Sequence, residues 1–329
     1  MTNGKKHLHL IGYMLSLLLS SLLTGCSSDT EERLEQGEPV SFSIEFCKPS
    51  TRSTIDNIWP DNTEITVYNG TDKHNYKTGA NSSAGTSGAA TALTPVSEAF
   101  YWTINNPNWQ FSAWYPAGTT ATTSMTVAED QSAVSADDYN AYDILYCSPS
   151  AAAFKETIPL HFHHQMARVI VIVSSSLTEQ KETVTSVAFG GNKLGLTGTI
   201  TTPSTTGENG TTVWSVEESI KTKSITMRPR AADTDTERYL YAFECMVVPQ
   251  TYASDTGVVY LTTTGSTDGN RSYTYTSTFD LKAGYQYIYN LVLSEQGTIK
   301  LATVQVEDWD DTPVNVDNTA TIPDNNYPN

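Results

Sequence analysis

Short runs of β-branched and aromatic residues recur along the chain, and they constrain its fold more than any other feature. The run from 167 to 173, Ala-Arg-Val-Ile-Val-Ile-Val, is typical of a strand that is covered on both faces. Turn residues such as Gly190, Gly191 and Pro249 separate many of the runs, and no long helical pattern lies between them. The sequence therefore predicts an all-β fold built from sandwiches rather than from parallel α/β units.

Two successive sets of strands are expected. The first set is expected at 40–46, 64–68, 99–104, 109–115, 124–128 and 142–147. The second set begins near Ile158, includes 167–173 and continues at 184–189, 196–201, 224–227, 239–248, 258–264, 273–281, 285–293 and 301–306. The segment 78–94 is rich in small residues and lacks periodicity, so we expect a mobile loop there. Because 329 residues suggest about two domains, we place an N-terminal sandwich at 53–157 and a C-terminal sandwich at 158–311.

The first 26 residues follow the order of a bacterial lipoprotein signal. Two lysines, Lys5 and Lys6, precede an apolar run from 10 to 23 that is short for a membrane span. Leu23-Thr24-Gly25-Cys26 then resembles a lipobox. We expect residues 1–25 to be a signal peptide, Cys26 to carry the lipid, and residues 26–52 to be a lipidated propeptide. The alternative is an ordinary secretory signal that contains a chance cysteine.

Acidic residues outnumber basic ones. The chain has 36 Asp and Glu against 19 Lys and Arg, for a formal charge of −17, so its overall field repels phosphates and argues against a nucleic acid partner. Asp29, Glu31 and Glu32 follow Cys26 closely. This acidic start resembles the export signal of surface lipoproteins in Bacteroidetes, and a solvated linker is the equal alternative.

The cysteine count argues against a full disulfide framework. The chain has four cysteines, and lipidation of Cys26 leaves the odd set Cys47, Cys147 and Cys245. Two of these three, such as Cys147 and Cys245, could pair in an oxidising compartment. We favour the other interpretation, in which they are small buried hydrophobic residues.

Strict alternation marks 40–46 as a half-buried strand, which we name the leading strand. Val40, Phe42, Ile44 and Phe46 point one way and the polar residues point the other. Cleavage after Arg52 by a trypsin-like protease would make Ser53 the first residue, and it would remove the lipid anchor together with the leading strand. If this strand completes the first sandwich, its loss leaves an apolar groove and a template for β-augmentation. The alternative is that Arg52 is a plain surface arginine.

The tail after Trp309, residues 312–329, has a pattern that suits a donor strand. Its apolar side chains share one parity, with Asn318 as the exception, and would match the sites that the leading strand vacates. The alternative is a disordered polar tail. The candidate donor residues are Val314, Val316, Ala320 and Ile322.

Catalytic motifs are not found, and we expect neither enzymatic activity nor a cofactor. Gly-x-Ser-x-Gly, a Walker loop and His-Glu-x-x-His are all missing from the sequence. The segment 190–195 superficially suggests a phosphate loop, but it lacks the Gly-Lys-Ser/Thr ending and no helical pattern follows. We therefore interpret it as a turn.

Some residues could form a metal or sugar site, but for each of them an ordinary role on the surface or in the core fits the sequence better. His161 and His163 would share one face of a strand, but no convincing acidic or cysteine partner lies nearby, so no metal is expected. The acidic residues around Trp309, namely Asp308, Asp310 and Asp311, fit a solvated turn better than a calcium site. Tyr and Trp residues could form a sugar platform, although they also fill sandwich cores.

Several segments, taken in order, resemble the fimbrillin family of Bacteroidales, the subunits and accessory proteins of protease-assembled pili. These segments occur in the same order as in the family, and together they cover nearly the whole mature chain. They are the lipobox 23–26; 41–44 ahead of 51–54; 61–67 after Trp59; 101–102 with 111–116; 143–146; 160–173 with its His-x-x-Ala-Arg-Val pattern; 248–251; 283–287; and 306–309.

This resemblance implies a fold of two transthyretin-like β-sandwiches in tandem. It also implies lipoprotein export, Arg-specific cleavage of the leading strand and assembly by strand exchange, with Arg52 at the family's cleavage position. The partners would be other pilus subunits, an arginine-specific protease, the lipoprotein export machinery and a host or bacterial surface ligand. The precursor would be an outer membrane lipoprotein and the product a cell-surface pilus. The resemblance does not choose among stalk, tip and anchor roles.

The interpretation that we favour is therefore a non-enzymatic pilus subunit, with a structural or adhesive role. The alternative from another class is a surface glycan-binding lipoprotein that stays lipid-anchored and monomeric. That alternative predicts an uncut Arg52 and exposed aromatic residues that respond to sugar.

Overall fold

Strands form nearly all the regular structure of this computed structural model. It describes residues 37–46, 59–79, 91–103, 109–120, 123–151, 153–175, 182–201, 213–231, 234, 240–266, 269–294 and 298–309. Besides a 3-10 residue at Ala231, the helical turns there are α2 (Ala136–Asn140) and the 3-10 turn η3 (Glu218–Ile220). The all-β prediction is confirmed, and the transthyretin-like likeness stays a prediction.

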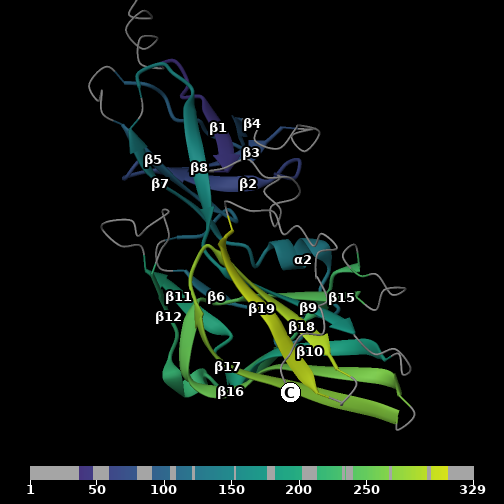
Figure 1. Cartoon of the computed structure of the whole chain (residues 1–329). Coiled ribbons are helices and arrows are strands. Elements are labelled where there is room, and N and C mark those ends of the chain that lie inside the picture. The colour runs from purple at the N-terminus through teal and green to yellow at the C-terminus, as the bar shows by residue number, and fades with distance from the viewer. Residues whose placement is uncertain are drawn as a thin grey trace, which may run out of the picture.

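The strands of the first part of the chain form one closed ring, in the upper part of Figure 1. Its order is β1-β4-β3-β2-β5-β7-β8, and the ring closes because β1 pairs with both β4 and β8. Apolar side chains from these strands fill one core, which we name the barrel core. The strands are β1 (Phe42–Phe46), β2 (Glu64–Tyr68), β3 (Lys73–Thr78), β4 (Thr91–Pro95), β5 (Gln110–Tyr115), β7 (Leu145–Ala151) and β8 (Ile158–His164).

Three more sheets lie below the barrel in Figure 1. Their orders are β13-β10-β16-β17, β14-β15-β9-β18-β19 and β12-β11-β6. The strands are β6 (Ser124–Thr126), β9 (Ala167–Ser175), β10 (Thr183–Leu194), β11 (Thr197–Thr201), β12 (Val213–Ser215), β13 (Lys223–Thr226), β14 (Arg228–Pro229), β15 (Leu240–Val247), β16 (Gln250–Ser266), β17 (Gly269–Leu281), β18 (Tyr285–Leu293) and β19 (Ile299–Asp308).

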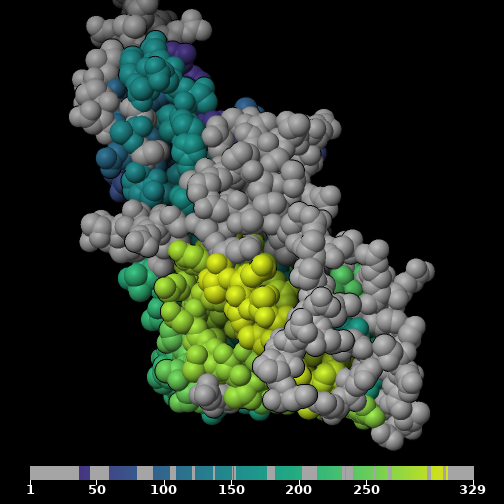
Figure 2. Space-filling model, viewed as in Figure 1, coloured from purple at the N-terminus to yellow at the C-terminus, as the bar shows by residue number. Residues whose placement is uncertain are grey.

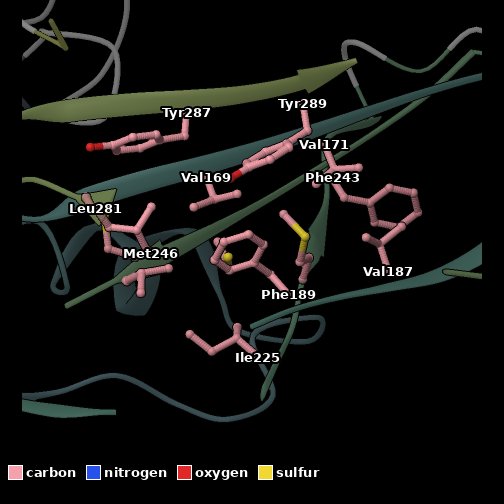
Figure 3. Close-up of a cluster of buried hydrophobic side chains, with 14 of the residues drawn as sticks. Val169, Val171, Val187, Phe189, Ile225, Phe243, Met246, Leu281, Tyr287 and Tyr289 are labelled. Carbon is pink, nitrogen blue, oxygen red and sulfur yellow. The ribbon is translucent and has the colours of Figure 1, made fainter. Parts of the chain in front are cut away.

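The four-stranded and five-stranded sheets share a large core, which we name the sandwich core. Figure 3 shows Val169, Tyr287 and Tyr289 on one side of it and Val187 with Phe189 on the other. Strand β9 lies between β15 and β18, and its alternate residues Ile170 and Ile172 pack with Ile288 on the opposite face. The prediction that 167–173 is covered on both faces is confirmed, since each of these residues is buried.

The sheet pairing does not change at residue 157. Strand β8 follows that expected boundary but pairs with β1 and β7 inside the barrel. Strand β6 precedes the boundary but pairs with β11. The chain therefore leaves the barrel once at β6, returns to it for β7 and β8, and enters the sandwich at β9, and the division into two domains stays a prediction.

Some local expectations differ from the structure. Strand β4 lies in the segment 78–94 that was expected to be a loop, and β3 was not predicted. The expected strand at 99–104 reduces, over its described residues, to a single bridge between Pro39 and Tyr101. The sequence did not predict β3 and β4 because they show little alternation of apolar and polar residues. Their backbone pairing with neighbouring strands holds them in the ring.

Strand β19 is an edge, because β18 is its one strand neighbour in the described sheet. The yellow strands at the C-terminal end form part of the visible surface in Figure 2. Val304 and Val306 of β19 are 40% and 56% exposed. No helix in the described part of the chain combines the length and the apolar character needed to cross a membrane.

Candidate functional site

The candidate site is the seat of β1, which is the leading strand of the sequence analysis. On one side β1 pairs antiparallel with β4, with Ser43 opposite Ala92. On the other side it pairs parallel with β8, from Phe42 opposite Ile158 to Phe46 opposite Phe162. A five-residue strand therefore satisfies two strand edges at once, and both edges would be exposed without it.

Three of the four predicted apolar positions of the leading strand lie in the barrel core. Val40, Phe42 and Ile44 are 4%, 1% and 0% exposed. The ring of Phe42 packs edge-on against Phe111 at 4.9 Å and against Tyr76 at 5.0 Å between ring centroids. Burial of each such side chain stabilises the fold by about 1.5–3 kcal/mol relative to an exposed one. The side chain of Phe46 lies outside the described residues.

The approach to β1 is fixed by backbone hydrogen bonds. Val40 N–H donates to the Phe100 carbonyl at 2.8 Å, and Trp102 N–H donates to the Glu38 carbonyl at 2.9 Å. Gly37 lies against the Trp102 carbonyl so closely that a Cβ at this position would collide with that oxygen. The chain thus runs along the 100–102 segment before it enters the barrel.

The processing and donor residues that the sequence predicts lie outside the described part of the chain, and their roles stay predictions. The structure does not bring them to the seat of β1 or exclude them from it. They are Cys26, Arg52, Ser53, Val314, Val316, Ala320 and Ile322.

A buried polar cluster joins the barrel to the sandwich, and the sequence analysis did not identify it. His164 Nδ1 lies 2.8 Å from Asp143 Oδ1, and both side chains are 0% exposed. The His164 ring stacks on the Trp309 indole, with centroids 4.0 Å apart and planes at 4°. The Arg168 guanidinium lies 5.4 Å from the centroid of that indole. The His-x-x-Ala-Arg-Val pattern was the available signal, but it carries no information about the distant Trp309.

Arg168 continues this cluster into a buried ion network. Its Nη2 donates to Glu244 Oε2 at 2.7 Å, and Arg230 Nη1 donates to the same oxygen at 2.6 Å. Burial alone would raise the pKa of Glu244, but the two guanidinium charges outweigh it and lower that pKa. Burial also raises the pKa of the neighbouring Tyr139 well above its usual value. These groups are packed in the core, and we assign them a structural role.

The structure does not complete a set of metal ligands around the residues that the sequence analysis considered for a metal site, as far as they are described. His161 and His163 lie on β8, and the described residues hold no group of three or more His, Cys, Asp or Glu side chains placed to bind a metal. Trp309, at the centre of the predicted acidic turn, is 2% exposed and belongs to the sandwich core. Residues 190–194 form the irregular end of β10, with positive φ at Gly190, Gly191 and Asn192, and the next described element is the strand β11.

Two of the three cysteines that we interpreted as small buried residues fit that interpretation, and the third, Cys47, lies outside the described residues. Cys147 lies in the barrel core and Cys245 lies in the sandwich core. Both are buried, and they do not form a disulfide with each other.

Solved structures with the same fold come from Bacteroides species. A proposed cell adhesion protein from Bacteroides ovatus ATCC 8483 is 16% identical, with a TM-score of 0.56 over 83% of this chain and 98% of that one. A second proposed cell adhesion protein, from Bacteroides uniformis ATCC 8492, is 17% identical, with a TM-score of 0.54 over 82% of this chain and 98% of that one. No protein of curated function gives a significant sequence match. The model of the fimbrillin-like family matches residues 51–309, and the chain therefore belongs to the fimbrillin-like family.

Proposed function

We propose that this protein is a non-enzymatic subunit of a cell-surface pilus or adhesive fibre, and that it assembles by exchange of the leading strand. Membership of the fimbrillin-like family supports the role as a pilus or adhesion subunit, and the likeness to proposed cell adhesion proteins agrees with that role. The observation that carries the finer mechanism is the double pairing of β1.

The energetic argument starts from what departure of β1 would expose. The β4 and β8 edges would lose their partner, and the rings of Tyr76, Phe100 and Phe111 would lose their contact with Phe42. Unpaired backbone groups and an open apolar groove are both costly in water. An incoming strand with alternating apolar residues relieves both costs, which is the logic of β-augmentation.

In this proposal, proteolytic processing triggers the release of β1. Lipid attachment at Cys26 by the export machinery would hold the precursor at the outer membrane. Cleavage after Arg52 by an arginine-specific or trypsin-like protease would then cut the covalent link between β1 and the rest of the chain. Since Arg52 follows β1 closely in the sequence, one cut would free both the anchor and the strand.

The proposed donor is the tail of another copy or of another pilus subunit. Val314, Val316, Ala320 and Ile322 would take the positions of the leading-strand anchors. An alternating apolar pattern suits the seat because successive side chains of a strand point to opposite faces.

The deciding experiment is N-terminal sequencing with intact mass on protein from the native cell surface. Arg52→Ala is expected to leave a lipidated chain that starts at Cys26 and does not polymerise. The matched control is Arg33→Ala, which removes an arginine ahead of β1 and should leave a start at Ser53 and normal polymers. Normal polymers from Arg52→Ala would contradict the processing step.

A deletion of residues 313–329 tests the donor. We expect this chain to be cleaved normally and to cap growing fibres without extending them, because it can accept a strand but cannot give one. Unchanged polymer length in electron micrographs would contradict the donor assignment and would favour a tip role.

A further inference from the structure

A cavity of about 590 Å³ lies on residues of the second part of the chain, and none of the strands that pair with β1 lines it. Its walls come from the β12 segment, from the start of β16 and from the turn between β17 and β18. Trp214 and Tyr285 line it, and both are partly exposed. The volume falls within the usual range for small-molecule sites.

The charge of this cavity is opposite to that of the chain. Lys221 and Lys282 line it, and none of the described lining residues is acidic, in a protein with a formal charge of −17. Two carboxylates pair with these lysines from outside the lining: Glu218 lies 2.6 Å from Lys221, and Asp280 lies 3.9 Å from Lys282. The Glu218 carboxylate is 85% exposed and both members of the Lys282–Asp280 pair are exposed, so water screens these ion pairs and an incoming anion can compete with the carboxylates.

The walls are held in place before any ligand arrives. Trp214 Nε1 donates to the Gln165 carbonyl at 2.7 Å, so the indole is anchored by its edge. Lys221 Nζ donates to the Thr251 carbonyl at 3.2 Å, and its side chain is only 8% exposed.

Gln250 fixes the wall next to them. Its amide donates to the Gly195 carbonyl at 2.9 Å and accepts from the Gly195 N–H at 2.9 Å. Such preorganisation reduces the entropy lost on binding.

We propose that this cavity binds a saccharide that carries a carboxylate or a sulfate. The apolar C–H face of a sugar ring can pack on the electron-rich faces of Trp214 and Tyr285. The acidic group would then accept charge-assisted hydrogen bonds from Lys221 and Lys282. This inference deepens the adhesive part of the proposed function by naming a ligand class, and it needs neither cleavage nor strand exchange.

The test is calorimetric titration of the full chain, made soluble by Cys26→Ser, with three acidic probes and one neutral probe. The acidic probes are 3′-sialyllactose, a hyaluronan tetrasaccharide and a chondroitin sulfate disaccharide, and the neutral probe is lactose. We expect at least one acidic probe to bind with a Kd of about 0.1–1 mM, more weakly as salt rises, while lactose binds at least about tenfold more weakly.

Two variants locate the binding. Lys282→Glu and Ser215→Glu each place a carboxylate at exposed lining positions, so each should weaken the acidic probe by about tenfold or more. The matched control for Lys282→Glu is Lys73→Glu, at an exposed lysine of the barrel, which makes the same change in net charge and should bind as the parent does.

Equal loss in Lys282→Glu and Lys73→Glu would assign the effect to net charge and overturn the site. Failure of all three acidic probes at about 5 mM, well above the expected Kd, would also overturn it. Neither result would affect fibre assembly by the native chain, so failure of this inference is distinguishable from failure of the proposed function.

Discussion

Phe42 is the side chain on which the seat of β1 depends most. It is 1% exposed and contacts Phe111, Tyr76 and Phe100 edge-on. Phe42→Ala should lower the free energy of unfolding by about 3–5 kcal/mol, because a ring-sized cavity remains among rigid neighbours. The measurement is urea unfolding of the uncleaved chain. The control Phe154→Ala makes the same change at a side chain that is 46% exposed, and an equal loss there would refute the special role of Phe42.

Glu244 gives a prediction about pH at the residue scale. Its folded pKa is lowered, so the stability it contributes is present above its unfolded pKa, near 4.5, and is lost as pH falls through the folded pKa. Glu244→Gln should cost about 3–5 kcal/mol at pH 7, because Arg168 and Arg230 lose their buried countercharge. The difference between variant and parent in urea unfolding should shrink below pH 4.5. Glu129→Gln, at an exposed pair, should show little change at any pH.

At the scale of elements, alternation predicted β1 well and failed for β3. In β1 each second residue is apolar, and Phe42 and Ile44 are buried, so the local sequence already shows the alternation of a half-buried strand. Strand β3 reads Lys-His-Asn-Tyr-Lys-Thr, in which Tyr76 is the one large apolar residue, and it forms because β2 and β4 pair with it on both sides. Pairing partners that are distant in the chain are not visible in local periodicity.

The entry to β1 gives a prediction for the same element. Gly37→Ala would place a methyl group against the Trp102 carbonyl, so the segment ahead of β1 must shift. We expect a lower midpoint of thermal unfolding and faster hydrogen exchange at Val40, whose N–H bonds to the Phe100 carbonyl. Gly79→Ala is the matched control, because a Cβ there has no neighbour within 4 Å. Identical behaviour of the two variants would show that the close approach at Gly37 is unimportant.

At the scale of the whole molecule, local sequence patterns do not indicate how the barrel and the sandwich meet. The acidic residues around Trp309 suggested a solvated turn, yet Trp309 is buried against His164 of β8 and near Arg168 of β9. These residues are far apart in the chain, and only the complete fold brings them together. The leading strand was predictable for a different reason, since its apolar residues alternate within one short segment of the sequence.

Trp309 therefore supports a prediction about cooperativity. Its backbone N–H donates to the Gly284 carbonyl at 2.8 Å, which holds the end of β19 within the sandwich. Its ring stacks on His164 of β8 at 4.0 Å between centroids, so the side chain contacts the end of the barrel. Calorimetry should show one unfolding transition for the parent and two separated transitions for Trp309→Ala, because the link between the two cores is weakened. The control is Trp102→Ala, which removes a similarly buried indole that lies within the barrel core. It should lower the stability of the barrel but should not separate the unfolding of the two cores into two transitions. A single transition in Trp309→Ala, shifted only in temperature, would mean that other contacts couple the two cores and that Trp309 contributes packing alone.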